Sequence, residues 1–307
     1  MSCEPTTNEN SRTTNFPVFL RWTPATVLRV SGEDAASFLQ GQFSNDLREL
    51  DRKKPVYGLW LNHKGRVIAD SFVHRLAEGD FLVFSYHCPV EVIRPRLEAF
   101  VIADDVVLED VTLEWGGITV LGPETHSVYS NIVSALQSEG ISFSGRRTAR
   151  PHLECVFPRR LESAAVSMLT NVPEISEAEA QLIRIVDGIP SVPADIGPSE
   201  LPNEGGLEGV AISYTKGCYL GQEVIARLKS MGQVRRRLLR VQGTGALPLL
   251  PASLFQGERR IGELRTIART AEGFLGFVLV SLVNLQLDTG LSFSPGGEVV
   301  MKLMEKP

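Results

Sequence analysis

Residues 216–227 read KGCYLGQEVIAR, and this stretch is the most informative part of the chain. Two glycines, Gly217 and Gly221, flank a lone cysteine, and the residues after them follow a helical pattern. The pattern predicts a turn that brings the Cys218 thiol to the first turn of a short helix. A helix N-terminus carries partial positive charge, and with Lys216 nearby it should lower the pKa of the thiol. We therefore expect a nucleophilic cysteine, the alternative being an inert, buried one.

The sequence on either side of the cysteine adds two further features. Glu223 and Arg227 are four residues apart with the acid first, an order that permits pairing across one helical turn. An ordinary surface pair, worth only about 0.3–0.5 kcal/mol, is the alternative. Before the motif, residues 190–209 hold four prolines and four glycines, too many for regular structure. A loop of this length inside a compact domain is usually functional.

The remaining chain alternates β-type runs with single helices. The best-marked helix begins after Ser176, which forms a capping box with Glu179. Another is expected after Ser31, with Asp34 at its third position. Strands are expected in the first half at 25–30, 55–61, 66–74, 80–86, 106–115 and 118–121, and further helices at 92–102, 124–139 and 160–171. This alternation predicts an α+β fold.

Residues after Gln233 are strand-like again. Short apolar runs are separated by glycine and proline, and they cover 234–241, 253–255, 260–267, 274–282 and 298–303. Several short strands punctuated by turn residues are typical of a small antiparallel β-barrel. We therefore expect a separate C-terminal barrel.

Composition excludes several classes of protein. The 307 residues are enough for two or three compact domains, and their formal charge of −5 argues against a nucleic-acid partner, apart from the basic run 235–237. The four cysteines lie far apart in the sequence, so they predict neither a disulfide framework nor a zinc site; they are Cys3, Cys88, Cys155 and Cys218. No apolar run reaches the roughly 20 residues that a membrane span needs. Residues 1–15 read as a disordered tail without a targeting signal, so we expect a cytoplasmic protein.

The motif, followed by Gly232 and Arg236-Arg237-Leu238, is similar to the signature of the YgfZ-type folate-binding proteins. These are relatives of the glycine-cleavage T-protein, a tetrahydrofolate-dependent aminomethyltransferase. Further blocks resemble the family in the same order: residues 30–35, 38–41, 44–47, 61–62, 64–66, 69–70, Arg184, 188–190, Asp195, Pro202 and 212–213. The resemblance extends over about residues 28–240.

The resemblance implies a fold and a function. It implies a three-domain ring around a central folate pocket, with two interleaved α+β domains over 16–240 and the barrel over 241–307. It also implies a tetrahydrofolate-binding accessory protein for assembly or repair of iron–sulfur enzymes, with a link to tRNA modification. The implied partners are a reduced folate and iron–sulfur client or assembly proteins, with no direct nucleic-acid contact and no membrane.

Residue by residue, the resemblance proposes a catalytic pair and a folate-binding set. The pair is Cys218 and Asp70. The set is Asp195, Asn62, Arg66, Lys216, Gly217, Tyr219, Gly221, Gln222, Glu223, Arg227, Arg236 and Arg237. A carboxylate such as Asp195 pairs well with the amino-pyrimidinone edge of a pterin, and a guanidinium pairs with the glutamate tail of folate. The alternatives are a turn-capping aspartate and a solvated basic strand face.

The sequence also departs from the T-protein pattern. The T-protein has two adjacent acids where this chain has Ala69-Asp70, a tyrosine where it has Val192, and a glutamate where it has Val186. Loss of these groups removes acid–base capacity that aminomethyl transfer needs, so we rank that activity second. A non-catalytic scaffold is the third hypothesis. The five histidines never fall at metal-ligand spacing, and no P-loop, GxGxxG or GxSxG element is present.

Overall fold

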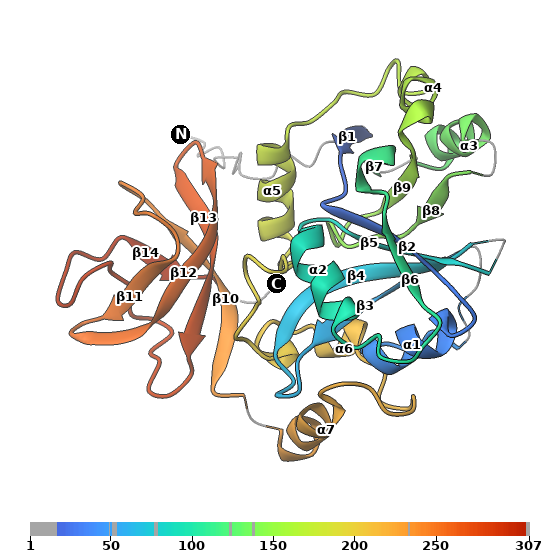
Figure 1. Cartoon of the computed structure of the whole chain (residues 1–307). Helices are drawn as coiled ribbons and strands as arrows, with labels where there is room; N and C mark the ends of the chain where they lie inside the picture. Colours follow the sequence, from blue (N-terminus) through green and yellow to red (C-terminus); the bar gives the residue numbers. More distant parts are fainter. Residues whose placement is uncertain are drawn as a thin grey trace.

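The computed structural model describes residues 17–48, 50, 54–76, 79–122, 125–136, 139–232 and 234–304. The expected tail 1–15 and Cys3 lie outside these residues. Three antiparallel sheets and seven α-helices make up the described chain. Figure 1 shows the C-terminal sheet on one side, two further sheets on the other, and helix α5 between them.

The first sheet has four strands in the order β1-β7-β9-β8. Its strands are β1 (Val18–Trp22), β7 (Trp115–Leu121), β9 (His152–Pro158) and β8 (Ile141–Phe143). Helices α3 (Thr125–Ala135) and α4 (Glu162–Ser167) pack with it around a small core that includes Ile118, Ile132 and Phe157. The N-terminal strand β1 therefore pairs with a strand that lies about one hundred residues further along the chain, with Val18 opposite Leu121.

The second sheet has five strands in the order β3-β4-β5-β2-β6. They are β3 (Val56–Leu61), β4 (Val67–Arg75), β5 (Phe81–Ser85), β2 (Thr26–Ser31) and β6 (Val107–Asp110), and helices α1 (Ala35–Gln42) and α2 (Val90–Glu98) complete the unit. Almost every residue of β4 and β5 is buried, so this sheet is the centre of the largest apolar core. Its rigidity makes it a suitable support for a site.

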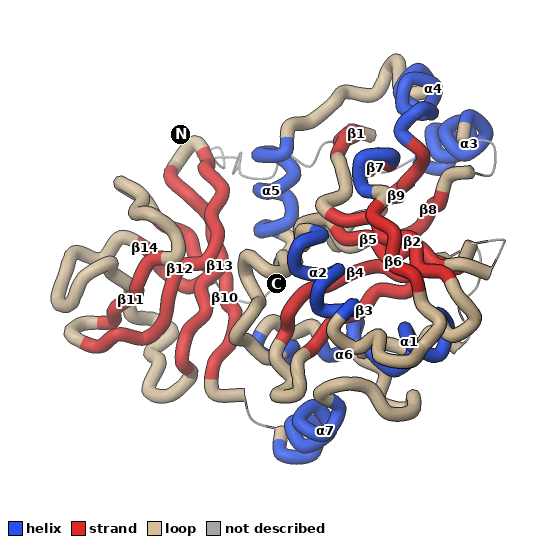
Figure 2. Tube along the Cα trace, in the orientation of Figure 1, coloured by secondary structure: helices blue, strands red, loops and turns tan. Residues whose placement is uncertain are grey.

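The C-terminal sheet is open, so the expectation of a closed barrel was wrong. Its order is β11-β12-β13-β10-β14, with β11 (Ala252–Gln256), β12 (Arg259–Thr270), β13 (Gly273–Ser281), β10 (Arg236–Gly243) and β14 (Met301–Leu303). The edge strands β11 and β14 do not pair with each other. Single β-bridges, Phe255 to Ser292 and Leu291 to Met301, connect the intervening segment to these two strands. The sheet is curled around its own core, as Figure 2 shows, but it does not close.

Helix α5 (Glu177–Val186) connects the C-terminal sheet to the other two. Ser176 and Glu179 form the reciprocal capping box that the sequence predicts. Ile185 on this helix is fully buried against Ala268 and Phe277 of the C-terminal sheet. The irregular stretch after α5 holds only η3 (Pro202–Glu204) and α6 (Glu208–Ala211) before α7 (Gln222–Met231).

Two other helix starts differ from expectation. Helix α1 begins at Ala35 with Asp34 at its N-cap, because Gly32 takes a left-handed φ of +113° and so prevents the helix from starting at Ser31. The helix expected over 160–171 is shorter: a 3₁₀ turn, η2 (Arg159–Leu161), leads into α4. A further short 3₁₀ turn, η1 (Thr112–Glu114), precedes β7. No described helix is both long and apolar enough to cross a membrane.

Candidate functional site

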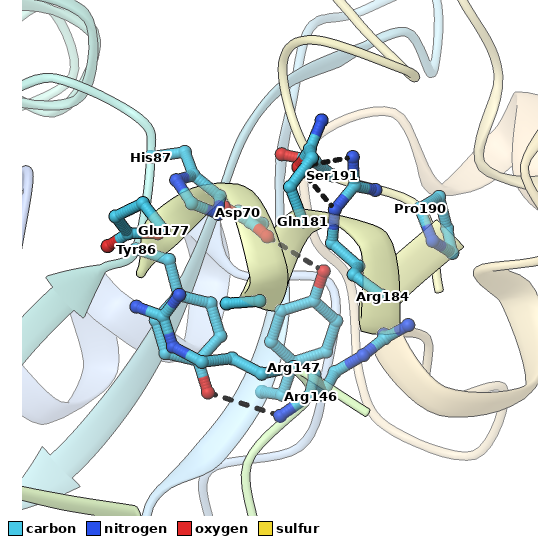
Figure 3. A pocket seen from close by; sticks show the side chains of 12 residues that line it. Asp70, Tyr86, His87, Arg146, Arg147, Glu177, Gln181, Arg184, Pro190 and Ser191 are labelled. Atoms are coloured by element: carbon cyan, nitrogen blue, oxygen red, sulfur yellow. Dashed lines mark hydrogen bonds between the residues drawn. The ribbon is translucent and has the colours of Figure 1, made fainter. Parts of the chain in front are cut away.

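A cavity lies where α5 faces β4, β5 and the loop between β8 and β9 (Figure 3). Its volume is about 30 Å³, room for about one water molecule. It is lined by Tyr57, Asp70, Tyr86, His87, Arg146, Arg147, Glu177, Ala180, Gln181, Arg184, Pro190 and Ser191. A neighbouring hollow of about 550 Å³ shares His87, Gln181, Arg184 and Ser191 and is also lined by Pro193, Ala194, Gly197, Pro198 and Thr266. Together they form one polar site, which we call the Asp70 cavity.

Asp70 is the buried carboxyl group of this cavity. The Tyr57 hydroxyl donates to its Oδ2 over 2.9 Å, and the Ser85 hydroxyl donates to its Oδ1 over 3.0 Å. The Cys88 thiol lies 3.3 Å from the same Oδ1. Burial raises the pKa of Asp70, and these three donors oppose the rise only in part. Burial also raises the pKa of Cys88 far above its usual range, so this thiol stays protonated.

Two arginines enter the cavity from the loop between β8 and β9. Arg147 is held firmly: its guanidinium carbon lies 4.4 Å from the ring centroids of both Trp22 and Tyr86, and its Nε lies 3.7 Å from Glu154. Arg146 stacks on Tyr57, with 4.3 Å between the guanidinium carbon and the ring centroid. Burial and repulsion from Arg147 and Arg184 lower the pKa of the neighbouring His87, so its imidazole is neutral at pH 7.

Asp195 has a different environment from Asp70. It is fully buried and accepts from Arg184 Nη1 over 2.6 Å, from the Ser191 backbone N–H over 2.8 Å and from the Thr266 hydroxyl over 2.5 Å. These contacts join α5, the loop after it and the C-terminal sheet. Asp195 lines neither part of the cavity. Its geometry is that of a group that holds three parts of the chain together.

Two of the expected folate-binding arginines line another hollow. Arg66 and Arg236 face a space of about 730 Å³ beside Leu228 of α7. Arg236 is paired with Glu204 over 2.9 and 3.0 Å, and Arg66 donates to the backbone oxygen of Ser199. The structure therefore separates these arginines from Asp70.

The motif lysine is directed away from the thiol. Lys216 is only 4% exposed, and its ammonium donates to the backbone oxygens of Gln40 (2.6 Å), Phe43 (2.6 Å) and Asn45 (3.0 Å). These oxygens lie at the C-terminal end of α1, where a cation is favourable. Burial lowers the pKa of Lys216 to about 8. No hydrogen bond joins Lys216 to Cys218, so the expectation that this ammonium activates the thiol is not supported by a contact.

Two other motif residues attach the loop to the second sheet. Tyr219 packs into the largest core. Gly221 has a φ of +86°, and a Cβ there would lie 2.6 Å from the backbone oxygen of Asn62. Asn62 in turn holds its own turn, because its Oδ1 accepts from the backbone N–H of Lys64 and Arg66. The motif and the Asn62 turn therefore fit closely, and only glycine suits position 221.

Between these attachments, Gly217 and Cys218 are exposed. Helix α7 begins at Gln222 after the Gly221 N-cap, so Cys218 precedes the helix by several residues instead of lying in its first turn. In Figure 1 the segment between α6 and α7 lies at the lower edge of the molecule, whereas α5 lies at its centre. Cys218 lines none of the hollows described above.

The remaining motif residues lie around this exposed loop. Glu223 and Arg227 are exposed and make no ion pair with each other. Gln222 and Arg237 are partly buried in α7 and β10. Among the described residues, no group of three or more His, Cys, Asp or Glu side chains could hold a metal ion. Most of the expected residues thus divide among the Asp70 cavity, the Arg66 hollow and the Cys218 loop, whereas Asp195 and Arg237 line none of the three hollows.

Sequence reasoning missed several residues of the Asp70 cavity. Tyr57, His87, Gln181 and Ser191 stand in no recognisable motif, and Arg146 and Arg147 are an ordinary basic pair in a loop. The pairing of β8 with β9 brings that loop toward β4, and this long-range arrangement leaves no local signal.

The sequence and the fold of the chain are both similar to those of known proteins. Residues 22–154 match the family model described as GCVT N-terminal domain. A tRNA-modifying protein YgfZ from Vibrio atlanticus (strain LGP32) is 28% identical over 306 residues, which cover 93% of this chain and 90% of that protein. The crystal structure of glycine cleavage system aminomethyltransferase T from Bartonella henselae superposes with a TM-score of 0.77. The chain therefore shares the fold of this aminomethyltransferase and is similar to a YgfZ protein over nearly its whole length.

Further curated proteins are also similar to the chain. The YgfZ protein of Vibrio vulnificus (strain CMCP6) is 25% identical over 244 residues, 77% of this chain and 73% of that protein. An iron-sulfur cluster assembly factor IBA57 homolog of Mycosarcoma maydis, named as mitochondrial, is 27% identical over 230 residues, 69% of this chain and 54% of that protein. The Bartonella aminomethyltransferase shares 17% identity, covers 94% of this chain and 85% of its own, and shows the common fold.

Proposed function

We propose that the chain is an accessory protein for the assembly or repair of iron–sulfur enzymes. Its reactive group is Cys218, and its cofactor is a reduced folate bound in the Asp70 cavity. The names of the relatives support the first part, since they are called iron-sulfur cluster assembly factors and tRNA-modifying proteins. The observation that carries the proposal is the exposed thiol on a firmly attached loop.

The loop is suited to contact with another protein. Lys216 and Tyr219 are buried and Gly221 is closely packed, whereas Gly217 and Cys218 between them are exposed. A thiol in this position can reach a cluster or a sulfur species held by a client, and no conformational change is needed to uncover it. Thiolate is the form that ligates iron and acts as a nucleophile. The cluster is then the cargo of the reaction and not a resident cofactor.

A folate fits the second site in size and in chemistry. The wider part of the cavity, about 550 Å³, is within the range of small-molecule sites. The amino-pyrimidinone edge of a pterin carries N–H donors, and Asp70 and Glu177 are the carboxyl groups that line the narrow part of the cavity. We therefore assign the pterin-facing role to Asp70, which lines the cavity, instead of Asp195, which lines neither part of it.

The first test is a calorimetric titration with tetrahydrofolate. Wild-type protein should bind it, and Asp70→Asn should bind at least about tenfold more weakly, because a charge-assisted contact contributes about 1.5–3 kcal/mol. Absence of any binding to the wild type favours the scaffold hypothesis and removes the folate from the proposal.

The second test concerns the cellular role. Cells that lack the protein should lose activity of iron–sulfur enzymes, while enzymes without clusters keep theirs. The wild-type chain should restore the lost activity. Equal activity of both enzyme classes in its absence contradicts an iron–sulfur role.

A folate-dependent one-carbon transferase is the second candidate. It is favoured by one observation, the buried Asp70 carboxyl group that lines the cavity and whose pKa is raised by burial, since such a group can act as a general acid or base. Purified protein with tetrahydrofolate, an amine and labelled formaldehyde should then transfer label with turnover. Transfer no faster than in an Asp70→Asn sample excludes this candidate.

A further inference from the structure

The Arg66 hollow is the most spacious of the three hollows and lies apart from the Asp70 cavity. Its volume of about 730 Å³ is in the range of small-molecule sites. The turn between β3 and β4, the loop that includes Ser199, helix α7 and the ends of β10 and β13 all contribute to its lining. None of its lining residues also lines the Asp70 cavity. It is therefore a separate space with walls of its own.

The carboxylate in this hollow is already paired. Glu204 accepts from Arg236 Nε over 2.9 Å, from Arg236 Nη2 over 3.0 Å and from the Leu201 backbone N–H over 2.8 Å. Glu200 lies outside the lining and pairs with Arg265 over 2.8 Å. Three arginines and one glutamate line the hollow, so an excess of two positive charges remains there.

This excess belongs to Arg66 and Arg235. Arg66 uses Nη1 to bind the backbone oxygen of Ser199, which fixes the guanidinium and leaves its other N–H groups available. The side chain of Arg235 is exposed, and the Arg235 backbone oxygen accepts from the Leu282 N–H over 2.8 Å. Among the described residues, no carboxylate lies within ion-pair distance of either guanidinium. The hollow therefore offers two positioned cations to an anion.

The rest of the lining indicates what else the anion carries. Leu201, Leu228, Val234 and Val283 form an apolar wall from four segments. No aromatic side chain of the described chain lines this hollow, so a planar ring would find no ring to stack on. A guanidinium fork matches a carboxylate or a phosphate. An acid group on an aliphatic chain suits both halves of the lining.

We propose that the Arg66 hollow is a second ligand site, which binds an aliphatic acid. The carboxylate or phosphate of the ligand pairs with Arg66 and Arg235, and its chain covers Leu228 and Val283. This site differs from the proposed folate site in position and in chemistry, and it does not depend on folate binding.

The experiment uses calorimetry on the full chain with two probes, octanoate and octyl phosphate. Acetate and inorganic phosphate carry the same acid groups without the aliphatic chain. Affinities are measured for the wild type, Arg66→Met, Arg235→Met and the double variant. Arg269→Met is the matched control, because Arg269 is an exposed arginine of β12 that lines none of the hollows. Arg235 is also exposed, so its replacement should leave the fold intact.

The wild type and Arg269→Met should bind at least one eight-carbon acid at least about tenfold more tightly than its short counterpart, since buried methylene groups add affinity. Each single variant should weaken this binding at least about threefold, and the double variant at least about tenfold. Tighter binding of octanoate identifies a carboxylate ligand, and tighter binding of octyl phosphate identifies a phosphate. Either result supports the inference.

Three results would overturn the inference. The first is that neither eight-carbon acid binds the wild type. The second is an affinity that stays unchanged in the double variant. The third is displacement of tetrahydrofolate by the acid, or an equal loss of tetrahydrofolate affinity in Arg235→Met, because the hollow would then belong to the folate site. Failure of tetrahydrofolate to bind the wild type contradicts only the proposed folate site, since the acid probes are titrated without folate.

Discussion

Replacing Lys216 with methionine tests whether the motif lysine holds the Cys218 loop to α1. Methionine keeps an unbranched apolar side chain but loses the ammonium that donates to the oxygens of Gln40, Phe43 and Asn45. A hydrogen bond to a charged group contributes about 1.5–3 kcal/mol, and three bonds that share one ammonium are not additive. We expect the free energy of unfolding to fall by about 1–3 kcal/mol, because buried carbonyl oxygens lose their donor.

Urea denaturation followed by circular dichroism measures this change. Lys229→Met is the matched control, because Lys229 is exposed and only covers the Tyr214 ring at 4.0 Å, a contact worth about 0.5–1 kcal/mol. A loss below about 1 kcal/mol for Lys216→Met, or an equal loss for both variants, would refute the structural role of the lysine.

Three further predictions concern other residues of the motif and the cavity. Gly221→Ala should lower the free energy of unfolding by at least about 2 kcal/mol, because the φ of Gly221 is positive and the backbone of Asn62 leaves no room for a Cβ. A Cβ at Gly217 would meet no other atom, so Gly217→Ala should change the free energy of unfolding by less than about 0.5 kcal/mol in the same urea assay. Asp195→Ala should lower the free energy of unfolding by about 3–5 kcal/mol, because it leaves the buried Arg184 without its carboxylate. It should alter the affinity for tetrahydrofolate less than threefold in calorimetry. A large loss of affinity at unchanged stability contradicts this prediction. Burial raises the pKa of Asp70 above 3.8 and only the ionised form accepts from the pterin, so folate affinity should weaken as pH falls through that raised pKa, and Asp70→Asn should show a flat profile.

Local side-chain signals explain which elements the sequence predicts well. The capping box at Ser176 depends on residues three positions apart, and α5 starts where it indicates. The start of α1 depends instead on Gly32, whose left-handed backbone is packed against the oxygen of Asp105, more than seventy residues away. Closure of the C-terminal sheet depends on whether its two edge strands meet, which no local pattern encodes. Long-range contacts therefore account for both errors.

Long-range contacts also decide which parts of the candidate site the sequence could predict. The motif at 216–227 was recognisable, and the comparisons confirm the resemblance that it indicates. The direction of the Lys216 ammonium was not predictable, because its acceptors lie about 170 residues earlier in the chain. Arg146 reaches Tyr57 only through the fold, and Asp195 differs from Asp70 only in its surroundings. Residue type alone cannot separate a cavity carboxylate from one that joins three segments.

The role of the Cys218 thiol is tested most directly in cells that lack the protein and receive single variants. The activity of an iron–sulfur enzyme is measured, with an enzyme that has no cluster as the internal reference. Cys218→Ala should give no rescue, while Thr215→Ala, an exposed change on the same loop, should restore activity to the wild-type level. Full rescue by Cys218→Ala, at protein levels equal to the wild type, would contradict the proposed function of the thiol.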